Sequence, residues 1–146
     1  MITAEKFNLN LTEDYLKYYP ILSKWWRLWN WTEILPKFLP TNGIIIKYKD
    51  EYVFAGFLYS TDSSMSIIDF IVSSKKKYEG DIRKQCLIKL IKTLEGLSIS
   101  LGFKAIFTCA SSKEANLVNN LLELGYGEGS KGGKGDQNMI TFIKKI

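Results

Sequence analysis

Residues 65–101, MSIIDFIVSSKKKYEGDIRKQCLIKLIKTLEGLSISL, hold the pattern that decides the fold. Met65 to Val72 is nearly continuously apolar, which predicts a strand buried on both faces in the middle of a mixed sheet. Ser73 to Asp81 is a polar, basic loop. Arg83 to Leu101 carries leucine and isoleucine at helical spacing, and Gly102 is placed to end that helix. The segment therefore predicts a strand, a loop and a long amphipathic helix in succession.

A second strand and helix follow this unit. Lys104 to Cys109 (KAIFTC) is typical of a short buried strand. The run Ser111-Ser112-Lys113-Glu114 has the spacing of a capping box, so we expect a helix from there to Leu124, ended by Gly125. A strand, a helix, a second strand and a second helix form a βαβα unit. Such a unit requires a right-handed crossover and a parallel strand pair.

The residues before Met65 favour antiparallel pairing. Gly43 to Lys49 and Tyr52 to Ser60 are two strand-like runs separated only by Asp50-Glu51, which predicts a tight hairpin. The last strand is expected at Met139 to Lys144. Between it and the preceding helix lies a glycine-rich stretch, Gly127 to Gly135, which we interpret as a mobile hairpin tip.

Aromatic residues at three- and four-residue steps predict an N-terminal helix, capped by Asn10 or Thr12. Pro20 is expected to kink or divide it, and a second short helix is expected at Glu33 to Phe38. The fold class is therefore α/β with a mixed sheet. It has N-terminal helices, antiparallel strands and then a βαβα unit with one parallel strand pair, in a single domain over residues 1–146.

Composition narrows the chemistry. The 146 residues include no His, which excludes HExxH zinc sites, Ser-His-Asp triads and imidazole bases. Two isolated cysteines, Cys86 and Cys109, cannot form a four-ligand zinc site, so we expect no metal and reduced thiols. The N-terminus lacks the apolar core of a signal peptide, and no apolar run approaches ~18 residues. We therefore expect a soluble cytoplasmic protein without membrane contact, whose net charge of +5 favours anionic partners.

Four segments carry a resemblance to a known family. They are Ile68 to Val72, an acidic-then-apolar strand ending in Val; Tyr78 to Arg83, in the place of a phosphate loop; Leu101 to Ile106, a helix-to-strand junction; and Leu122 to Tyr126, a late helix closing with Leu-Gly-Tyr. In order and spacing they resemble the GNAT superfamily of N-acetyltransferases. That family transfers an acyl group from acyl-coenzyme A to an amine.

The resemblance implies acetyl-CoA as cofactor and places its pyrophosphate at the start of the long helix. Backbone N–H groups at a helix N-terminus form an anion nest, and Lys75 to Lys77 and Arg83 add positive charge beside it. The alternative for this lysine run is a solvated charged face. The pantetheine arm is expected to pair along Ile71 and Val72. The expected cofactor-binding residues are Phe70, Ile71, Val72, Lys77, Tyr78, Glu79, Gly80, Asp81, Ile82, Arg83 and Ser111.

The resemblance also implies catalytic groups. Asp69, a carboxylate expected to be buried in an apolar strand, is the candidate general base; the alternative is a strand-edge Asp paired with a Lys. At the family's usual position for a proton-donating Tyr this chain has Leu121, so Tyr126, Tyr78 or water would donate instead. A bulge near Phe70 and Ile71 would aim an N–H group at the thioester oxygen.

Trp and Cys side chains are further candidates for roles in the site, as an acceptor-binding wall and as a nucleophile. Trp25, Trp26, Trp29 and Trp31 lie where the family forms its acceptor wall, although covering one side of the sheet is the favoured interpretation. Adjacent Trp25 and Trp26 are not both expected to face the core, so one is predicted to be exposed. For Cys109, a buried packing residue is favoured over a nucleophile, and packing is likewise favoured for Cys86.

Three functions are consistent with these residues. The first is an N-acetyltransferase acting on a primary amine of a small molecule or protein. The second is a catalytically inactive binding module of the same fold, because Ile82 and Arg83 occupy positions where the family has small residues. The third and least favoured is a basic nucleic-acid-binding protein. Exposed aromatic residues also favour a homodimer.

Overall fold

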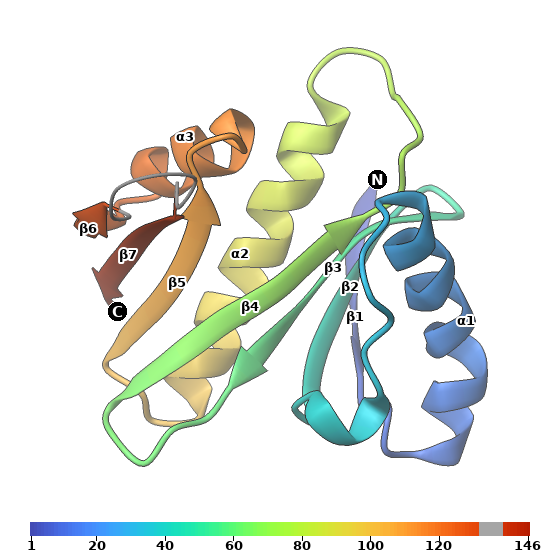
Figure 1. Ribbon diagram of the computed structural model, residues 1–146, viewed down its shortest axis with the longest axis horizontal. Coiled ribbons are helices and arrows are strands. Elements are labelled where there is room, and N and C mark those ends of the chain that lie inside the picture. Colours follow the sequence, from blue (N-terminus) through green and yellow to red (C-terminus); the bar gives the residue numbers. More distant parts are fainter. Residues whose placement is uncertain (132–138) are drawn as a thin grey trace.

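The computed structural model describes residues 1–131 and 139–146 (Figure 1). Within these residues one mixed sheet has the strand order β1-β2-β3-β4-β5-β7-β6. Neighbours are antiparallel except β4 and β5, which are parallel. The strands are β1 (Ile2–Phe7), β2 (Asn42–Tyr48), β3 (Glu51–Tyr59), β4 (Met65–Ser73), β5 (Ala105–Ser111), β6 (Gly127–Lys131) and β7 (Met139–Lys145). The expected mixed sheet with one parallel pair is confirmed.

Helices cover both faces of the sheet (Figure 1). α1 (Thr12–Leu28) lies on one face, and α2 (Ile82–Ser100) and α3 (Ala115–Glu123) lie on the other. The crossover from β4 through α2 to β5 brings the loop at 74–81 and the first turn of α2 to the carboxyl end of β4. None of the helices in the described ranges is long and apolar enough to span a membrane.

Each layer has its own apolar core. On one face α2 buries a row of aliphatic side chains, Leu87, Leu90, Ile91 and Leu94, against the sheet, as its spacing predicts. On the other face α1 buries Tyr18, Leu22, Trp25 and Trp26 against side chains that include Phe7 and Phe57. Cores on both sides of the sheet explain why the central strand β4 is almost continuously apolar.

The N-terminal region differs from its prediction in three ways. β1 was not expected; it forms one edge of the sheet by pairing with β2. Pro20 lies inside α1 without dividing it, and its side chain is exposed. The expected helix at Glu33 to Phe38 is only a short 3₁₀ turn at Pro36–Phe38. A six-residue edge strand gives little period-two signal, which explains why the sequence pattern missed it.

The later boundaries agree more closely. α3 begins after Glu114 rather than at Ser112, because β5 continues through Ser111, which pairs with Met139. Glu114 still accepts a long hydrogen bond of 3.4 Å from the Ser111 N–H, as in a capping box. Gly125, with φ of 93°, follows the end of α3 as expected. Of the stretch interpreted as a hairpin tip, 127–131 form β6, and 132–135 lie outside the described residues.

Candidate functional site

The site begins where β4 and β5 diverge. The two strands pair only from Met65↔Ala105 to Ile68↔Thr108. At the last pair the buried Thr108 hydroxyl donates a 2.8 Å hydrogen bond to the Ile68 carbonyl. Beyond it β4 stays paired with β3, and β5 with β7, so the sheet opens between β4 and β5 (Figure 1).

A β-bulge lies at the start of this opening. Phe57 pairs with Asp69 and Ala55 with Val72, so one residue of β3 faces both Phe70 and Ile71 of β4. Phe70 has φ of 54°, a left-handed conformation that costs a bulky residue roughly 1–2 kcal/mol. The bulge expected near Phe70 and Ile71 is therefore confirmed.

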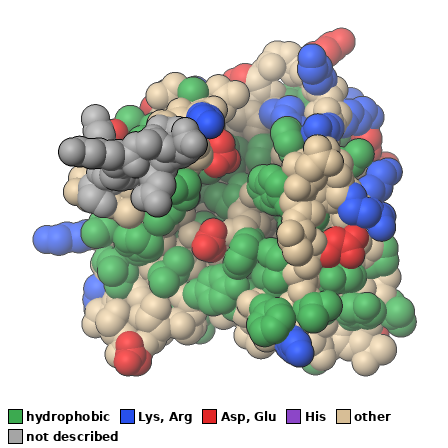
Figure 2. Space-filling model, viewed as in Figure 1, with side chains coloured by type: hydrophobic (Ala, Val, Ile, Leu, Met, Phe, Trp, Pro, Cys, Tyr) green, Lys and Arg blue, Asp and Glu red, His purple; other side chains and the backbone are tan. Residues whose placement is uncertain are grey.

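A cleft of about 830 Å³ occupies the opening between the strands. Figure 2 shows a hollow there with mainly hydrophobic walls. Its lining comes from the end of β4, the start of α2, the start of α3, and the segment after α1. The lining residues are Trp29, Trp31, Phe54, Ile71, Val72, Ser73, Gly80, Asp81, Arg83, Lys84, Leu87, Ser111, Lys113, Glu114, Ala115, Asn116, Leu117 and Asn120.

A smaller pocket of about 180 Å³ adjoins the cleft at the bulge. Four residues, Trp31, Ile71, Glu114 and Leu117, line both spaces, so the two lie side by side. The pocket is otherwise lined by Asp69, Phe70, Thr108, Cys109 and Met139. Apolar and aromatic walls with two carboxylates suit a molecule that has an apolar body and a cationic amine.

Asp69 lies at this small pocket, but its environment differs from the expected one. Its side chain is exposed rather than buried. Its Oδ1 accepts a 2.7 Å hydrogen bond from the Phe70 N–H, which fixes the carboxylate at the bulge. Among the described residues it forms no ion pair with a lysine, so the structure does not support the alternative of a strand-edge pair.

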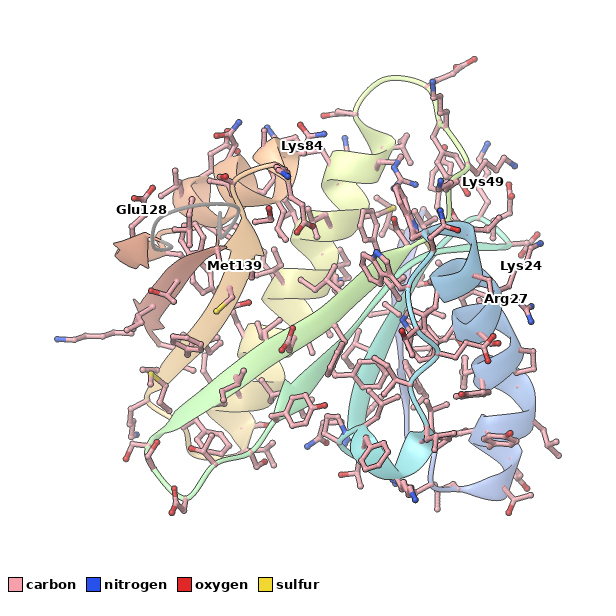
Figure 3. The ribbon with its side chains drawn as sticks, in the orientation of Figure 1. Lys24, Arg27, Lys49, Lys84, Glu128 and Met139 are labelled. Atoms are coloured by element: carbon pink, nitrogen blue, oxygen red, sulfur yellow. The ribbon has the colours of Figure 1, made fainter. Side chains whose placement is uncertain are left out.

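The cations of the loop do not lie where they were expected. Lys76 forms an ion pair of 2.6 Å with Glu51 of β3, and the Lys75 ammonium lies 4.5 Å from the centre of the Trp29 ring. Lys77 is exposed and lines neither space. Of the four expected cations, Arg83 lines the cleft, together with Lys84 and Lys113. Figure 3 shows Lys84 at the start of α2, facing α3, where it pairs with Glu123.

The expected cofactor-binding residues divide into two groups. Six of them line the cleft: Ile71, Val72, Gly80, Asp81, Arg83 and Ser111. Phe70 lines the small pocket. The remaining four, Lys77, Tyr78, Glu79 and Ile82, line neither space, and Tyr78 packs edge-on against Tyr48 instead. Their side chains are therefore not part of the lining, while the backbone of Ile82 begins the first turn of α2.

Tyr126, the expected proton donor, is also remote from both spaces. It is buried beside α2, and its hydroxyl donates a 2.8 Å hydrogen bond to Glu95. Burial and the Glu95 charge raise the pKa of Tyr126. Lys144 completes the cluster, 3.1 Å from the same carboxylate. This placement suits a structural group, so the candidate site does not include Tyr126.

Both cysteines behave as packing residues. Cys86 is buried in the core beneath α2, and burial raises the pKa of its thiol. Cys109 lines the small pocket, where burial and the charge of Asp69 raise the pKa of its thiol. A raised pKa reduces the thiolate fraction and with it the nucleophilicity of either residue.

The tryptophans divide between core and site. Trp25 and Trp26 are both buried, with 4% and 0% of their surface exposed, so the prediction that one is exposed was wrong. The segment after α1 folds back along the helix, where Glu33 accepts a hydrogen bond from Ser23. This segment covers part of α1 beyond the side that packs on the sheet, so more of the helix surface is buried. Trp29 and Trp31 line the cleft as part of that segment.

Helix α3 supplies site residues that the sequence analysis missed. Asn120 is only 4% exposed and lines the cleft. Its Nδ2 donates to the Asn116 carbonyl at 2.8 Å, while its Oδ1 has no partner among the described residues. The available signal was an Asn on the apolar face of an amphipathic helix, next to buried Leu121. Glu114 and Lys113 were noted only as part of the capping box.

Comparisons with known proteins identify the fold. No protein-family model matches the sequence, and no curated protein matches it either. Solved structures do match. An N-acetyltransferase from Staphylococcus aureus has a TM-score of 0.72 and 10% identity, covering 99% of this chain and 97% of its own. The ribosomal-protein-S18-alanine N-acetyltransferase from Escherichia coli has a TM-score of 0.67 and 13% identity, covering 100% and 94%.

An acetyltransferase from Bacillus subtilis in complex with CoA has a TM-score of 0.61 and 10% identity, covering 100% of this chain and 99% of its own. Identities this low establish the shared architecture rather than a shared activity. The chain therefore has the fold of the GNAT acyl-CoA N-acyltransferases, over nearly its whole length.

Proposed function

We propose that this protein is an N-acetyltransferase that transfers an acetyl group from acetyl-CoA to a primary amine of a small molecule or a protein. The observation that carries the proposal is the bulge at Phe70 and Ile71, placed where β4 leaves β5. It joins a large cleft to a small pocket that holds two carboxylates. A long donor and a small acceptor can therefore meet at one point of the sheet.

The cleft has features that fit coenzyme A as the carrier of the donor. Its volume of about 830 Å³ lies in the range of pockets that take large ligands. The first turn of α2 presents backbone N–H groups without a side-chain cap, and Lys84 and Lys113 add positive charge, which suits phosphates. The unpartnered Oδ1 of Asn120 suits an N–H group of the pantetheine arm.

The proposed chemistry is direct acyl transfer, with the acetyl group supplied on the sulfur of coenzyme A. The amine nitrogen forms a bond to the acetyl carbon while the carbon–sulfur bond breaks. Asp69, held by the Phe70 N–H, accepts the proton that the amine loses. The Ile71 N–H is the candidate donor to the carbonyl oxygen, because the Phe70 N–H is already used. Water protonates the departing thiolate.

An inactive binding module is the competing proposal. It predicts a loop that fills the pyrophosphate site. Instead Gly80 and Asp81 line an open cleft, although Ile82 and Arg83 stand where the family has small residues. This favours a working donor site. We infer a single acyltransferase domain over residues 1–146.

Binding of acetyl-CoA tests the proposal directly. We expect calorimetry to give a 1:1 complex with a Kd in the micromolar to millimolar range typical of enzyme substrates. We also expect release of free thiol when the protein is mixed with acetyl-CoA and a panel of primary amines. Absence of binding at millimolar acetyl-CoA would contradict the proposed acyltransferase and favour the inactive module, whose loop would fill the pyrophosphate site. Binding without turnover on any amine would favour a module that has kept the donor site and lost catalysis.

Asn120→Leu is expected to separate binding from stability. Leucine removes a buried oxygen that has no partner among the described residues, and the lost Nδ2–H bond to Asn116 offsets part of that gain, so the free energy of unfolding should rise by at most about 1 kcal/mol. The same change removes the proposed acceptor for the donor arm, so acetyl-CoA should bind about tenfold more weakly, a loss of ~1.4 kcal/mol. Urea unfolding and calorimetry measure the two effects.

Asn119→Leu is the matched control for this change. Asn119 is the neighbouring residue of α3 and is exposed, so the substitution makes the same change in helix propensity without touching the cleft. We expect its affinity for acetyl-CoA to equal that of the wild type. A fall in stability of Asn120→Leu relative to this control, or unchanged affinity, would show that Asn120 is only structural.

A further inference from the structure

Arg83, in the first turn of α2, is a cation without an anionic partner among the described residues. Its Nη1 donates to the carbonyls of Ser74 and Lys76, at 2.8 and 3.0 Å. Its Nη2 donates to the Ser73 hydroxyl at 2.8 Å. The guanidinium is therefore directed toward the end of β4 and the loop that follows it. It donates to three neutral oxygens, one on Ser73 at the end of β4 and two on Ser74 and Lys76 of the loop.

The surroundings of Arg83 hold it in this position. Its guanidinium lies 5.1 Å from the centre of the Phe54 ring, within cation–π range. The residue is partly buried, and burial lowers the pKa of Arg83. A partly desolvated cation gains most from acceptors that are fixed in place, and the rigid guanidinium matches three acceptors that a lysine ammonium cannot reach together.

The end of β4 is held from two further directions. Trp29, from the segment after α1, donates its Nε1–H to the Ser73 carbonyl at 2.7 Å. The Ser74 N–H donates to the Val53 carbonyl of β3 at 2.9 Å. Both oxygens of Ser73 are thus occupied, the carbonyl by Trp29 and the hydroxyl by Arg83. Ser73 is the next residue of β4 after Ile71 and Val72, and all three residues line the cleft.

We propose that Arg83 is a positioning residue: it fixes the carboxyl end of β4 through Ser73, Ser74 and Lys76, so that the Ile71–Val72 backbone keeps its place for the donor arm. This inference rests on the proposed function. It assigns Arg83 a role other than phosphate binding, which falls to Lys84 and Lys113. It also gives a physical reason for a large residue at a position where the family has small ones.

A donor without phosphates separates the two roles. The full chain is assayed with acetyl-CoA and with S-acetyl-N-acetylcysteamine, a short thioester that carries no phosphate. For Arg83→Ala and Arg83→Lys we expect kcat/KM to fall by about tenfold or more with both donors. Both donors would use the Ile71–Val72 backbone, which these changes displace. For Lys84→Ala we expect a fall with acetyl-CoA alone. Wild-type kinetics of Arg83→Lys, or a loss confined to acetyl-CoA, would overturn the proposal.

Amide hydrogen exchange supplies a readout that does not depend on activity. In both Arg83 variants the amides of Ser73 and Ser74, which pair with β3, should exchange at least about tenfold faster than in the wild type, while Lys84→Ala should leave them unchanged. Equal protection in Arg83→Ala and the wild type would overturn the positioning role. If the wild type transfers no acetyl group to any amine, the proposed function fails, and the exchange result still decides the role of Arg83.

Discussion

Asp69→Asn is expected to lower kcat for acetyl transfer by about 10²–10⁴-fold, the usual contribution of a general base. The affinity for acetyl-CoA should stay close to that of the wild type, because Asp69 lines the small pocket and not the larger cleft. Steady-state kinetics with a reactive amine measure kcat, and calorimetry with coenzyme A measures the donor affinity.

The geometry of Asp69 makes this substitution informative. Its Oδ1 accepts a hydrogen bond from the Phe70 N–H, and an asparagine side chain keeps an oxygen that can accept the same bond. The bulge and the positive φ of Phe70 should therefore survive the change. What is lost is the capacity to take a proton, so a large fall in kcat reports on proton transfer rather than on distortion of β4.

Two further variants act as controls. Asp62→Asn removes the same charge from the exposed turn before β4 and should leave kcat unchanged. Glu114→Gln tests the other carboxylate of the small pocket, which comes from the start of α3. If Glu114→Gln loses far more activity than Asp69→Asn, then Glu114 is the base, and the assignment of Asp69 is wrong.

Sequence patterns predicted the centre of the fold well and its edge poorly. The strand at Met65 to Val72 and the helix that begins near Arg83 were recognisable because long, strongly periodic segments bury whole faces. β1 was missed because it is short and lies at the sheet edge, where only one side is paired. The α1 segment was recognised, yet Pro20 proved compatible with an exposed position inside it.

The candidate site was predictable in its backbone and much less so in its charges. The bulge near Phe70 and Ile71 followed from the resemblance of Ile68 to Val72 to a family strand. The loop lysines could not be assigned from sequence, because their partners, Glu51 and Trp29, come from distant segments. Tertiary contacts thus decided which cations face the cleft.

Phe57→Ala is expected to lower the free energy of unfolding by about 3–5 kcal/mol, the usual cost of deleting a buried aromatic ring. Phe57 is 0% exposed in the core between α1 and the sheet. Its ring packs edge-on against the ring of Phe7, with 5.5 Å between the two ring centres. Urea unfolding followed by fluorescence measures the change. Phe38→Ala is the matched control: this residue is 63% exposed, and the same substitution should change stability by at most about 0.5 kcal/mol.

The Phe57 variant also connects the core to the site, because Phe57 pairs with Asp69 directly beside the bulge. A domain typically has only about 5–15 kcal/mol of stability, so this loss leaves a marginal fold. The proposed ligand, coenzyme A, would bind only the folded chain, so saturating ligand should recover a few kcal/mol of stability, about 2.7 at 100 times Kd. A variant as stable as Phe38→Ala would contradict the role of Phe57 in the core. A destabilised variant that the ligand fails to stabilise would instead show that Phe57 is needed to shape the cleft.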